Sequence, residues 1–334
     1  MVKRTGNLMP LIASQENLRE AFLRATRGKS GKHAVVAFRQ RLEENLQEMQ
    51  RQLLNGTFLF GRYHFFTVYD PKRRVICAAS FPERVAFHAI MRICHPVFDD
   101  FQINDSYASR IGKGTYKALE RAREFCGRYR WFAKIDIRKY FDSIHHSVLL
   151  GQLYRLFKDP LLLNFFRDLI EGYEVEEGRG LPIGNLTSQY FANHYLAVAD
   201  HYAREQLHQH AMVRYMDDIL FFNNNLGQLK HNLAAMSRFI RKQLMLDIHT
   251  PVINRTSLGI PYLGYVVFAD RMRLNGRSQR RFVHKMAALS FYLKTGYIND
   301  KEYADRATCL MAFIDKADCQ NLKRRLADIP GMYP

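Results

Sequence analysis

Two adjacent aspartates, Asp217 and Asp218, lie between two largely apolar segments of the chain, residues 212–216 and 219–222. Strand-like runs on both sides of a short acidic step are typical of a tight β-hairpin, so we expect both carboxylates at its tip. Holding two like charges together is costly unless a cation neutralises them, which predicts a divalent metal ion at this turn. An ordinary surface turn is the alternative for the dipeptide alone, but the apolar flanks favour a rigidly held hairpin.

Phosphoryl transfer assisted by two metal ions requires carboxylates that converge from different strands. Asp136 is the best further candidate, because it follows the short, mostly apolar run 131–135 and therefore lies near a strand end. Mg²⁺ prefers oxygen ligands, so Asp136, Asp217 and Asp218 would suit it. Asp142 has the same chemistry, but it falls six residues later, in a turn or a first helical turn, and we interpret it as a helix cap.

Further motifs accompany these acids in a characteristic order. An aromatic residue, Phe141, stands five positions after the first acid, and the acidic pair belongs to a Tyr-Met-Asp-Asp box about 80 residues on. Between them lies Gly-Leu-Pro-Ile-Gly-Asn-Leu-Thr-Ser-Gln-Tyr-Phe-Ala-Asn at 180–193, with Tyr-Leu-Gly-Tyr at 262–265 downstream and Pro-Lys-Arg-Arg-Val-Ile at 71–76 upstream. From about residue 66 to 264, this series resembles a reverse transcriptase.

The resemblance implies an RNA-directed DNA polymerase that copies a template RNA into cDNA from dNTPs. Asp136, Asp217 and Asp218 are similar to the catalytic, metal-binding acids of that family. They would hold a pair of Mg²⁺ ions, for which Mn²⁺ can substitute. One ion would lower the pKa of the primer 3′-hydroxyl, and the other would hold the triphosphate and the departing pyrophosphate.

The resemblance also implies a nucleotide site. Lys72 and Arg74 look like clamps on the triphosphate, where cations offset developing charge; a solvated turn is the alternative. Phe141 looks like the steric gate that leaves no room for a 2′-hydroxyl, with a plain core aromatic as the alternative. The remaining nucleotide-binding residues implied by the motif at 180–193 are Ile183, Gly184 and Gln189.

Nucleic acid contacts are expected at four places, one of which is the Tyr-Met-Asp-Asp box itself. The glycine-rich stretch 107–115 allows close backbone approach, and its Arg110 and Lys113 can hold a template or primer phosphate, although the spacing is not that of a nucleotide P-loop. The Tyr-Leu-Gly-Tyr segment is similar to the family's hairpin at the primer end, and the basic C-terminal part would follow the duplex backbone. The other expected nucleic-acid-binding residues are Tyr215, Met216, Leu263, Gly264, Arg280 and Arg281.

The motif at 180–193 narrows the family. Many reverse transcriptases carry Gln at the position of Ile183 and Pro at that of Gln189, and the form seen here resembles the enzymes of diversity-generating retroelements, in a group II intron-like lineage. That resemblance implies mutagenic retrohoming, with errors at template adenines. It also implies a small, basic, oligomeric accessory protein as partner. Alternatives are a retron, group II intron or defence-associated reverse transcriptase, and, outside the polymerases, a catalytically inactive RNA-binding protein.

Composition agrees with a polyanionic partner. The 334 residues include 50 Lys and Arg against 32 Asp and Glu, a formal net charge of +18. An anionic membrane surface would also fit that charge, but no apolar run approaches the ~18 residues of a spanning helix, so we expect no membrane association. Five widely spaced cysteines form no Cys-x-x-Cys pair and are interpreted as reduced thiols of a cytoplasmic protein.

These residues require a scaffold, and the resemblance implies an α+β right-hand polymerase fold. Its expected parts are fingers at 1–105, a palm of antiparallel sheet and helices at 106–275, and a short helical thumb at 276–334. Apolar periodicity and turn signals place the elements. We expect a helix through Phe38–Leu53 capped by Gly56, a strand 58–69 returning at 70–76, helix 81–101, strand 131–137, helical stretch 145–171, helix 188–208, hairpin 212–223, helix 226–246, hairpin 262–275, and helices from 278 onward.

Overall fold

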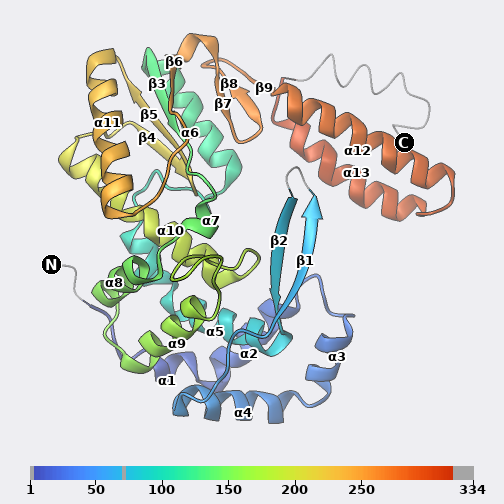
Figure 1. The fold of residues 1–334 in the computed structure, drawn as a ribbon. Helices are drawn as coiled ribbons and strands as arrows, with labels where there is room; N and C mark the ends of the chain where they lie inside the picture. Colours follow the sequence, from blue (N-terminus) through green and yellow to red (C-terminus); the bar gives the residue numbers. More distant parts are fainter. Residues whose placement is uncertain (1–3, 70–72, 319–334) are drawn as a thin grey trace. The chain divides into compact units, whose positions relative to one another are not determined.

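The computed structural model describes residues 4–69 and 73–318, which form two compact units, each assembled from separate stretches of the chain (Figure 1). Unit 1 takes residues up to 104, then 137–208 and 235–249. Unit 2 takes 105–136, 209–234 and the chain from 250 onward. The chain passes from unit 2 to unit 1 directly after Asp136, so all three candidate acids belong to unit 2, whereas Phe141 and the motif at 180–193 belong to unit 1.

Unit 1 is mostly helical. Its elements are α1 (Met9–Ile12), α2 (Gln15–Thr26), α3 (His33–Gln40), α4 (Leu42–Asn55), β1 (Tyr63–Tyr69), β2 (Arg73–Ala79), α5 (Phe81–Phe101), α7 (Tyr140–Ser143), α8 (His146–Leu156), α9 (Pro160–Glu171), α10 (Leu186–His201) and a π-helical segment (Tyr202–Gln206). Phe98 of α5 lies at the centre of its core, with its ring 5.4 Å from that of Phe157 and 6.3 Å from that of Phe191.

Helix α5 has the bounds that the sequence predicts, because its start is encoded locally. Ser80 and Glu83 form a reciprocal capping box, and a proline occupies the first turn. The expected strand from residue 58 was wrong by five residues, since β1 begins at Tyr63. Glu83 explains the delay: its Oε1 accepts hydrogen bonds from the backbone N–H groups of Gly61 (2.7 Å) and Arg62 (3.1 Å), and Arg62 directly precedes the strand.

The expected helical stretch 145–171 is two helices, α8 and α9. The break follows from a pairing that is distant in sequence: Thr5 donates its N–H to the Leu156 carbonyl and accepts from the Lys158 N–H, both at 2.8 Å. Asp159 then caps α9, whose first residue is a proline. Helix α4 ends as predicted at Gly56, which has a left-handed φ of 70°. The single helix expected through Phe38–Leu53 is divided at Arg41, where α3 ends and α4 begins.

In its described residues, unit 2 combines antiparallel sheets with helices. Its elements are α6 (Thr115–Arg128), β3 (Trp131–Ile135), β4 (Met212–Tyr215), β5 (Asp218–Asn223), β6 (Val252–Arg255), a 3₁₀ turn (Thr256–Leu258), β7 (Ile260–Tyr262), β8 (Tyr265–Val267), β9 (Met272–Leu274), α12 (Gly276–Lys294) and α13 (Asp300–Asp315). Helix α11 (Leu226–Gln243) begins in unit 2 and ends in unit 1. The expected hairpin at 262–275 is thus a three-stranded meander, β7-β8-β9.

The larger sheet of unit 2 has the order β4-β5-β3-β6, so the two strands that carry the acids are neighbours (Figure 1). Apolar side chains from both sheets of unit 2, from α6 and from α12 share one core, which includes Leu119, Phe132, Leu220, Tyr265 and Phe282. Burying such side chains holds the sheet and its turns in place. Across the described residues, no helix combines the length and apolar character that crossing a membrane requires.

Candidate active site

The three candidate acids lie at one end of the larger sheet of unit 2. Strands β3 and β5 pair antiparallel, with Ile135 opposite Ile219. Asp136 follows β3 directly, and continuing the register by one residue brings it opposite Asp218, the first residue of β5. The charge of Asp136 acts on the Asp218 carboxyl, because it raises the pKa of that group. Two acids that lie 82 positions apart in sequence are therefore neighbours.

Asp217 lies in the two-residue turn that joins β4 to β5. Tyr215 pairs with Asp218, which leaves Met216 and Asp217 as the turn residues. Met216 has a φ of 56° while Asp217 does not enter the positive region, the φ pattern of a type II′ turn. A side chain at positive φ costs about 1 kcal/mol or more, so packing and hydrogen bonds elsewhere must hold the turn in this form.

A buried arginine supplies part of that support. Arg214 is 0% exposed, and its Nη1 donates to the Met216 carbonyl at 3.1 Å. Its backbone is tied to the segment before α6: the Arg214 N–H donates to the Asp105 carbonyl, and the Tyr107 N–H donates to the Arg214 carbonyl, both at 2.9 Å. The guanidinium therefore places a positive charge inside the hairpin that presents the acids. No spacing rule in the sequence marks this arginine as buried.

Lys134 holds Asp218. Its Nζ lies 2.8 Å from Oδ1 of Asp218 and donates to the Pro261 carbonyl at 3.3 Å. Burial raises the pKa of the Asp218 carboxyl, the Lys134 ammonium lowers it, and the charge of Asp136 raises it further; the net direction is upward. The alternation of strand side chains places Lys134 and Asp136 on the same side of the chain, a signal from which this lysine could have been found.

Tyr262 lies beneath this pair. It is 1% exposed, its ring centroid is 6.0 Å from Lys134 Nζ, and its hydroxyl has no hydrogen-bond partner within the described part of the chain. Burial raises the pKa of this phenol well above its usual value, and the Asp218 charge adds to the increase. The Tyr262 hydroxyl is thus a neutral, buried group near Asp218. The sequence pointed to its neighbours Leu263 and Gly264 instead.

The glycine-rich stretch before α6 is tied to the Tyr-Met-Asp-Asp hairpin. Thr115 donates its hydroxyl to the Tyr215 hydroxyl at 3.1 Å, and Gly114, at a φ of 113°, precedes the helix. Arg110 Nη1 bonds the Ser106 carbonyl at 3.0 Å, and Lys113 Nζ lies 5.1 Å from the Tyr107 ring centroid. Both predicted phosphate-binding residues therefore belong to the unit that carries the acids.

The second predicted nucleic acid contact is the β7–β8 turn. Leu263 (φ 46°) and Gly264 (φ 91°) form a two-residue turn between Tyr262 and Tyr265, with the positive φ values of a type I′ hairpin. A Cβ at Gly264 would lie 3.0 Å from Ser278 Oγ on α12 and 3.4 Å from Phe313 Cζ on α13. This turn is thus packed against the C-terminal helices.

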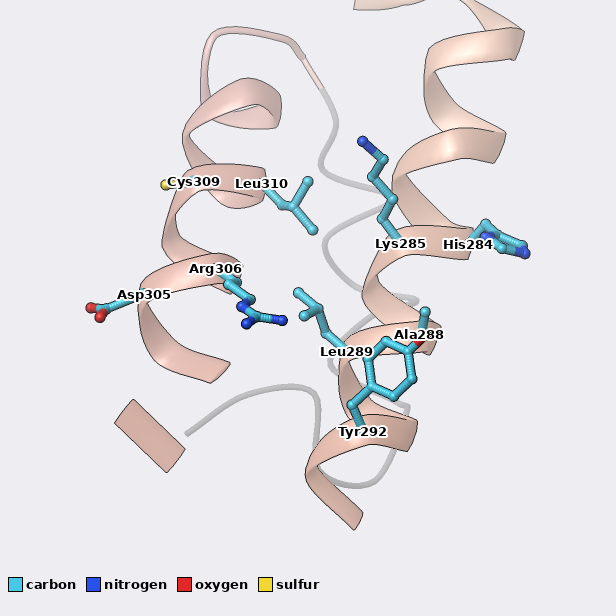
Figure 2. Close-up of a pocket in the computed structure, with 9 residues that line it drawn as sticks. All are labelled: His284, Lys285, Ala288, Leu289, Tyr292, Asp305, Arg306, Cys309 and Leu310. Carbon is cyan, nitrogen blue, oxygen red and sulfur yellow. The ribbon is translucent and has the colours of Figure 1, made fainter. Parts of the chain in front are cut away.

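Those helices present basic side chains around an apolar hollow. Between α12 and α13 lies a cavity of about 620 Å³ in which Leu289 and Leu310 face each other, while Asp305 points away (Figure 2). Of the predicted thumb residues, Arg280 is exposed and Arg281 half-buried. Lys285 and Arg306 add positive charge to this apolar lining, so the hollow favours an anionic or apolar contact.

The predicted nucleotide-binding residues lie in unit 1, where short contacts connect three of their segments. The Leu181 N–H donates to the Phe141 carbonyl at 2.9 Å, and the Cys77 N–H of β2 donates to the Ile183 carbonyl at 2.8 Å. A Cβ at Gly184 would lie only 2.8 Å from Ile76 Cγ2, so glycine permits this approach. The others are exposed Arg74 on β2 and exposed Gln189 on α10, while Lys72 lies outside the described residues.

Asp142 is not the helix cap that we expected. It lies inside the four-residue helix α7, whose N-cap is Lys139, and that helix has no side-chain cap. Burial raises the pKa of the Asp142 carboxyl, and the Lys139 charge opposes the increase. The short helix begins at Tyr140, whose hydroxyl donates to the Ala192 carbonyl of α10, so its position is set by tertiary packing.

The donor set at the sheet end fits a hard divalent cation. Asp136 is exposed, Asp217 and Asp218 are half-buried, and all three offer only oxygen ligands. Within residues 4–69 and 73–318, no three His, Cys, Asp or Glu side chains are close enough together to hold a metal ion. Water and substrate phosphates commonly complete a Mg²⁺ shell, so the neighbouring carboxylates of Asp136 and Asp218 at this end of the sheet can serve as the protein's contribution.

Comparison with known proteins identifies a family. Residues 72–267 match the family described as "Reverse transcriptase (RNA-dependent DNA polymerase)". Similar proteins include the group II intron-encoded protein LtrA of Lactococcus lactis subsp. cremoris, 21% identical over 68% of this chain and 41% of its own length. The putative COX1/OXI3 intron 1 protein of Saccharomyces cerevisiae is 23% identical over 65% of this chain and 26% of its own length. The chain thus spans less than half the length of these two relatives.

Solved structures support the fold. An apo telomerase structure from Candida tropicalis has a TM-score of 0.51 at 10% identity, covering 65% of this chain and 49% of that one. A structure of telomerase from the same organism with a TWJ fragment of telomeric RNA has a TM-score of 0.50 at 10% identity, covering 76% and 53%. At such low identity the likeness concerns the fold alone, and it confirms the predicted α+β polymerase fold.

Proposed function

This chain belongs to the reverse transcriptase (RNA-dependent DNA polymerase) family, and we propose that it copies an RNA template into cDNA. The observation that carries the proposal is the pairing of β3 with β5, whose register continues to Asp136 opposite Asp218. Carboxylates from two strands and the turn beside them are what two-metal phosphoryl transfer requires of a protein. The spread of basic residues over a chain of net charge +18 agrees with a nucleic acid partner.

We assign the proposed divalent cations, Mg²⁺ or Mn²⁺, to Asp136, Asp217 and Asp218. When bound, they would acidify the primer 3′-hydroxyl and offset charge on the triphosphate. Lys134 would keep Asp218 oriented by its 2.8 Å ion pair, and the buried Tyr262 ring, 6.0 Å from Lys134 Nζ, would help to hold the lysine in place. Both residues therefore position an acid without contributing an acidic group themselves.

The nucleotide is proposed to meet unit 1 through its sugar and phosphates. Lys72 and Arg74 would neutralise the triphosphate, and the Phe141 ring would exclude a 2′-hydroxyl, so deoxynucleotides are preferred. Ile183, Gly184 and Gln189 would line the nascent pair. The nucleic acid strands would be held by Arg110, Lys113 and the C-terminal arginines, with an affinity that falls steeply as salt rises.

Primer extension on a defined RNA template tests the activity. Wild-type protein with Mg²⁺ should elongate a labelled primer with dNTPs, and Asp136→Asn should abolish elongation. Asp270→Asn is the matched control, because Asp270 is an exposed carboxylate of the same unit that pairs with Arg271 at 2.6 Å. Activity that survives in Asp136→Asn, or is lost equally in both variants, would contradict the assignment.

We further propose that the enzyme serves a diversity-generating retroelement, copying a template-repeat RNA with errors at adenines. Ile183 supports this, because an aliphatic side chain offers bulk but no hydrogen bond, and a mismatch then leaves no buried polar group unsatisfied. Sequencing cDNA made from a defined RNA should show fewer errors opposite adenine for Ile183→Gln than for wild type. An unchanged error spectrum would show that Ile183 does not cause the errors opposite adenine.

The intron-encoded relatives favour a second candidate, a group II intron reverse transcriptase. The genomic surroundings discriminate: near-identical repeats differing at adenines support the retroelement, an intron supports the second candidate, and a structured noncoding RNA would indicate a retron. A catalytically inactive RNA-binding protein would bind RNA without extending a primer. The small basic accessory protein, the division into fingers, palm and thumb, and a cytoplasmic location stay predictions.

A further inference from the structure

Phe141 lies in a helix that is too short to fix its own position. Helix α7 spans four residues, begins at Tyr140 and has no side-chain cap. Helices of this length are not stable alone, because a single turn does not offset the cost of helix nucleation. Lys139, directly before the helix, has a φ of 42°, a left-handed conformation that side chains disfavour. Contacts with other segments must therefore place the Phe141 ring.

The main chain of α7 is tied to the start of the motif at 180–193. The Leu181 N–H donates to the Phe141 carbonyl, and the Gly180 N–H donates to the Ile144 carbonyl, both at 2.9 Å. These two bonds lie along one edge of the short helix. Rotation about that edge would still change the direction in which the Phe141 ring projects, so a contact on another side of α7 is needed to fix the ring.

The Tyr140 side chain makes such a contact. It is only 4% exposed, and its hydroxyl donates to the Ala192 carbonyl, which holds α7 against α10 (Figure 1). The Tyr140 ring also meets the Phe141 ring edge to face, with 5.8 Å between the ring centroids. A directional hydrogen bond fixes the depth and angle of the Tyr140 ring, and the contact between the rings transmits that position to Phe141.

The acceptor of this bond belongs to the helix that follows the residues proposed to line the nascent pair. Helix α10 begins at Leu186, two residues after Gly184, and carries Gln189 three residues before Ala192. Tyr140 therefore connects the proposed steric gate to the segment that would face the base pair. Exclusion of a 2′-hydroxyl is sensitive to small movements, because a displacement of about 1 Å is enough to change how a substrate fits.

We propose that Tyr140 is a positioning residue for sugar selection: its hydroxyl bond to α10 holds the Phe141 ring where that ring excludes a ribonucleotide. Tyr140 is buried and acts through Phe141, without touching the sugar itself. The inference rests on the proposed function and deepens it, because it assigns part of the preference for dNTPs over rNTPs to a residue outside the nucleotide site. Without the hydroxyl, the Phe141 ring keeps its main-chain bonds but can move away from the sugar.

Single-nucleotide incorporation with Mg²⁺ tests the inference, by comparing kcat/KM for a dNTP with kcat/KM for the matching rNTP. Tyr140→Phe removes only the hydroxyl, and it should fold because Ala192 lies inside α10, where its carbonyl also serves as a helical acceptor. Thermal unfolding checks this. Tyr190→Phe is the matched control: it removes a hydroxyl from α10 that is hydrogen-bonded to His95 Nδ1 of α5 at 3.0 Å, and so joins α10 to α5 instead of α7. Phe141→Ala, alone and combined with Tyr140→Phe, reports whether Tyr140 acts through the ring.

Tyr140→Phe should lower the dNTP-to-rNTP ratio about three- to tenfold, as expected for loss of one buried hydrogen bond, by raising kcat/KM for the rNTP. Tyr190→Phe should leave the ratio as in wild type, and Tyr140→Phe should have no further effect once Phe141 is alanine. A purely structural role would lower the use of both nucleotides alike, and that unchanged ratio would overturn the inference while leaving the proposed function intact. A change in the ratio that is equal in Tyr190→Phe, or that persists without the Phe141 ring, would overturn it too. Absence of extension by wild type would overturn the proposed function and this inference with it.

Discussion

Two hairpins of unit 2 have two-residue loops but differ in what determines the residues of the loop. Met216 and Asp217 join β4 to β5, and Leu263 and Gly264 join β7 to β8. In each, the first turn residue has a positive φ, 56° for Met216 and 46° for Leu263. The second position differs: Asp217 stays out of the positive region, whereas Gly264 has a φ of 91°.

The difference shows how a turn is chosen by what surrounds it. Gly264 faces α12 and α13 so closely that a Cβ would press on Ser278 Oγ, so packing dictates the residue. Asp217 follows Met216 in a turn that needs no glycine at its second position, and it places a second carboxylate next to Asp218, which already pairs with Lys134. The residues of the β7–β8 turn are thus set by packing, whereas the β4–β5 turn carries a carboxylate that the proposed chemistry requires.

The largest effect expected from this comparison is on catalysis at the acidic turn. Asp217→Ala should lower primer extension by about 10³-fold or more, because loss of a metal ligand removes several kcal/mol of transition-state stabilisation. RNA affinity, measured by anisotropy, should remain nearly whole. Asn223→Ala, at the other end of β5, is the control and should retain activity. Equal activity of Asp217→Ala and wild type would refute the role of the turn.

At the packed turn, stability should respond instead. Gly264→Ala combines a disfavoured φ with the 3.0 Å contact to Ser278 Oγ, and it should lower the free energy of unfolding by about 1–3 kcal/mol. Gly296→Ala isolates the backbone contribution, because Gly296 has a φ of 69° but no atom within 4 Å of the methyl group that alanine would add. Denaturant unfolding measures both. If the two variants lose the same stability, contact with α12 plays no part.

Much of this arrangement can be predicted from sequence where the signal is local. The start of α5 follows from Ser80, Glu83 and a proline, and the position of Asp136 follows from the end of an apolar run. What could not be predicted depends on contacts between distant segments. The pairing of Thr5 with the α8–α9 connection, or the burial of Arg214 beneath its own turn, leaves no periodic trace in the residues themselves.

A smaller effect, on the affinity for a divalent cation, should come from Lys134, whose positive charge pairs with Asp218. Lys134→Met removes a positive charge 2.8 Å from Asp218 and keeps the length of the side chain. Without nucleotide, Mn²⁺ should bind about three- to tenfold more tightly, because the cation no longer competes with the ammonium. Electron paramagnetic resonance of free Mn²⁺ measures this. Lys301→Met, an exposed lysine of α13, makes the same charge change elsewhere. Unchanged or weaker binding would show that Lys134 does not shield Asp218.

The smallest effect separates the first residues of the two turns. Met216→Gly relieves a positive φ and should raise the free energy of unfolding by up to about 1 kcal/mol, after the greater entropy of an unfolded glycine is subtracted. Met216→Ala keeps the strain and should show no gain. Leu263→Gly relieves the same backbone strain, but Leu263 packs against the core of unit 2, so loss of its side chain should lower stability by about 1–2 kcal/mol. If Met216→Gly raises and Leu263→Gly lowers the free energy of unfolding, side-chain packing stabilises the β7–β8 turn but not the β4–β5 turn. Changes of the same sign would mean that the two turns are stabilised alike.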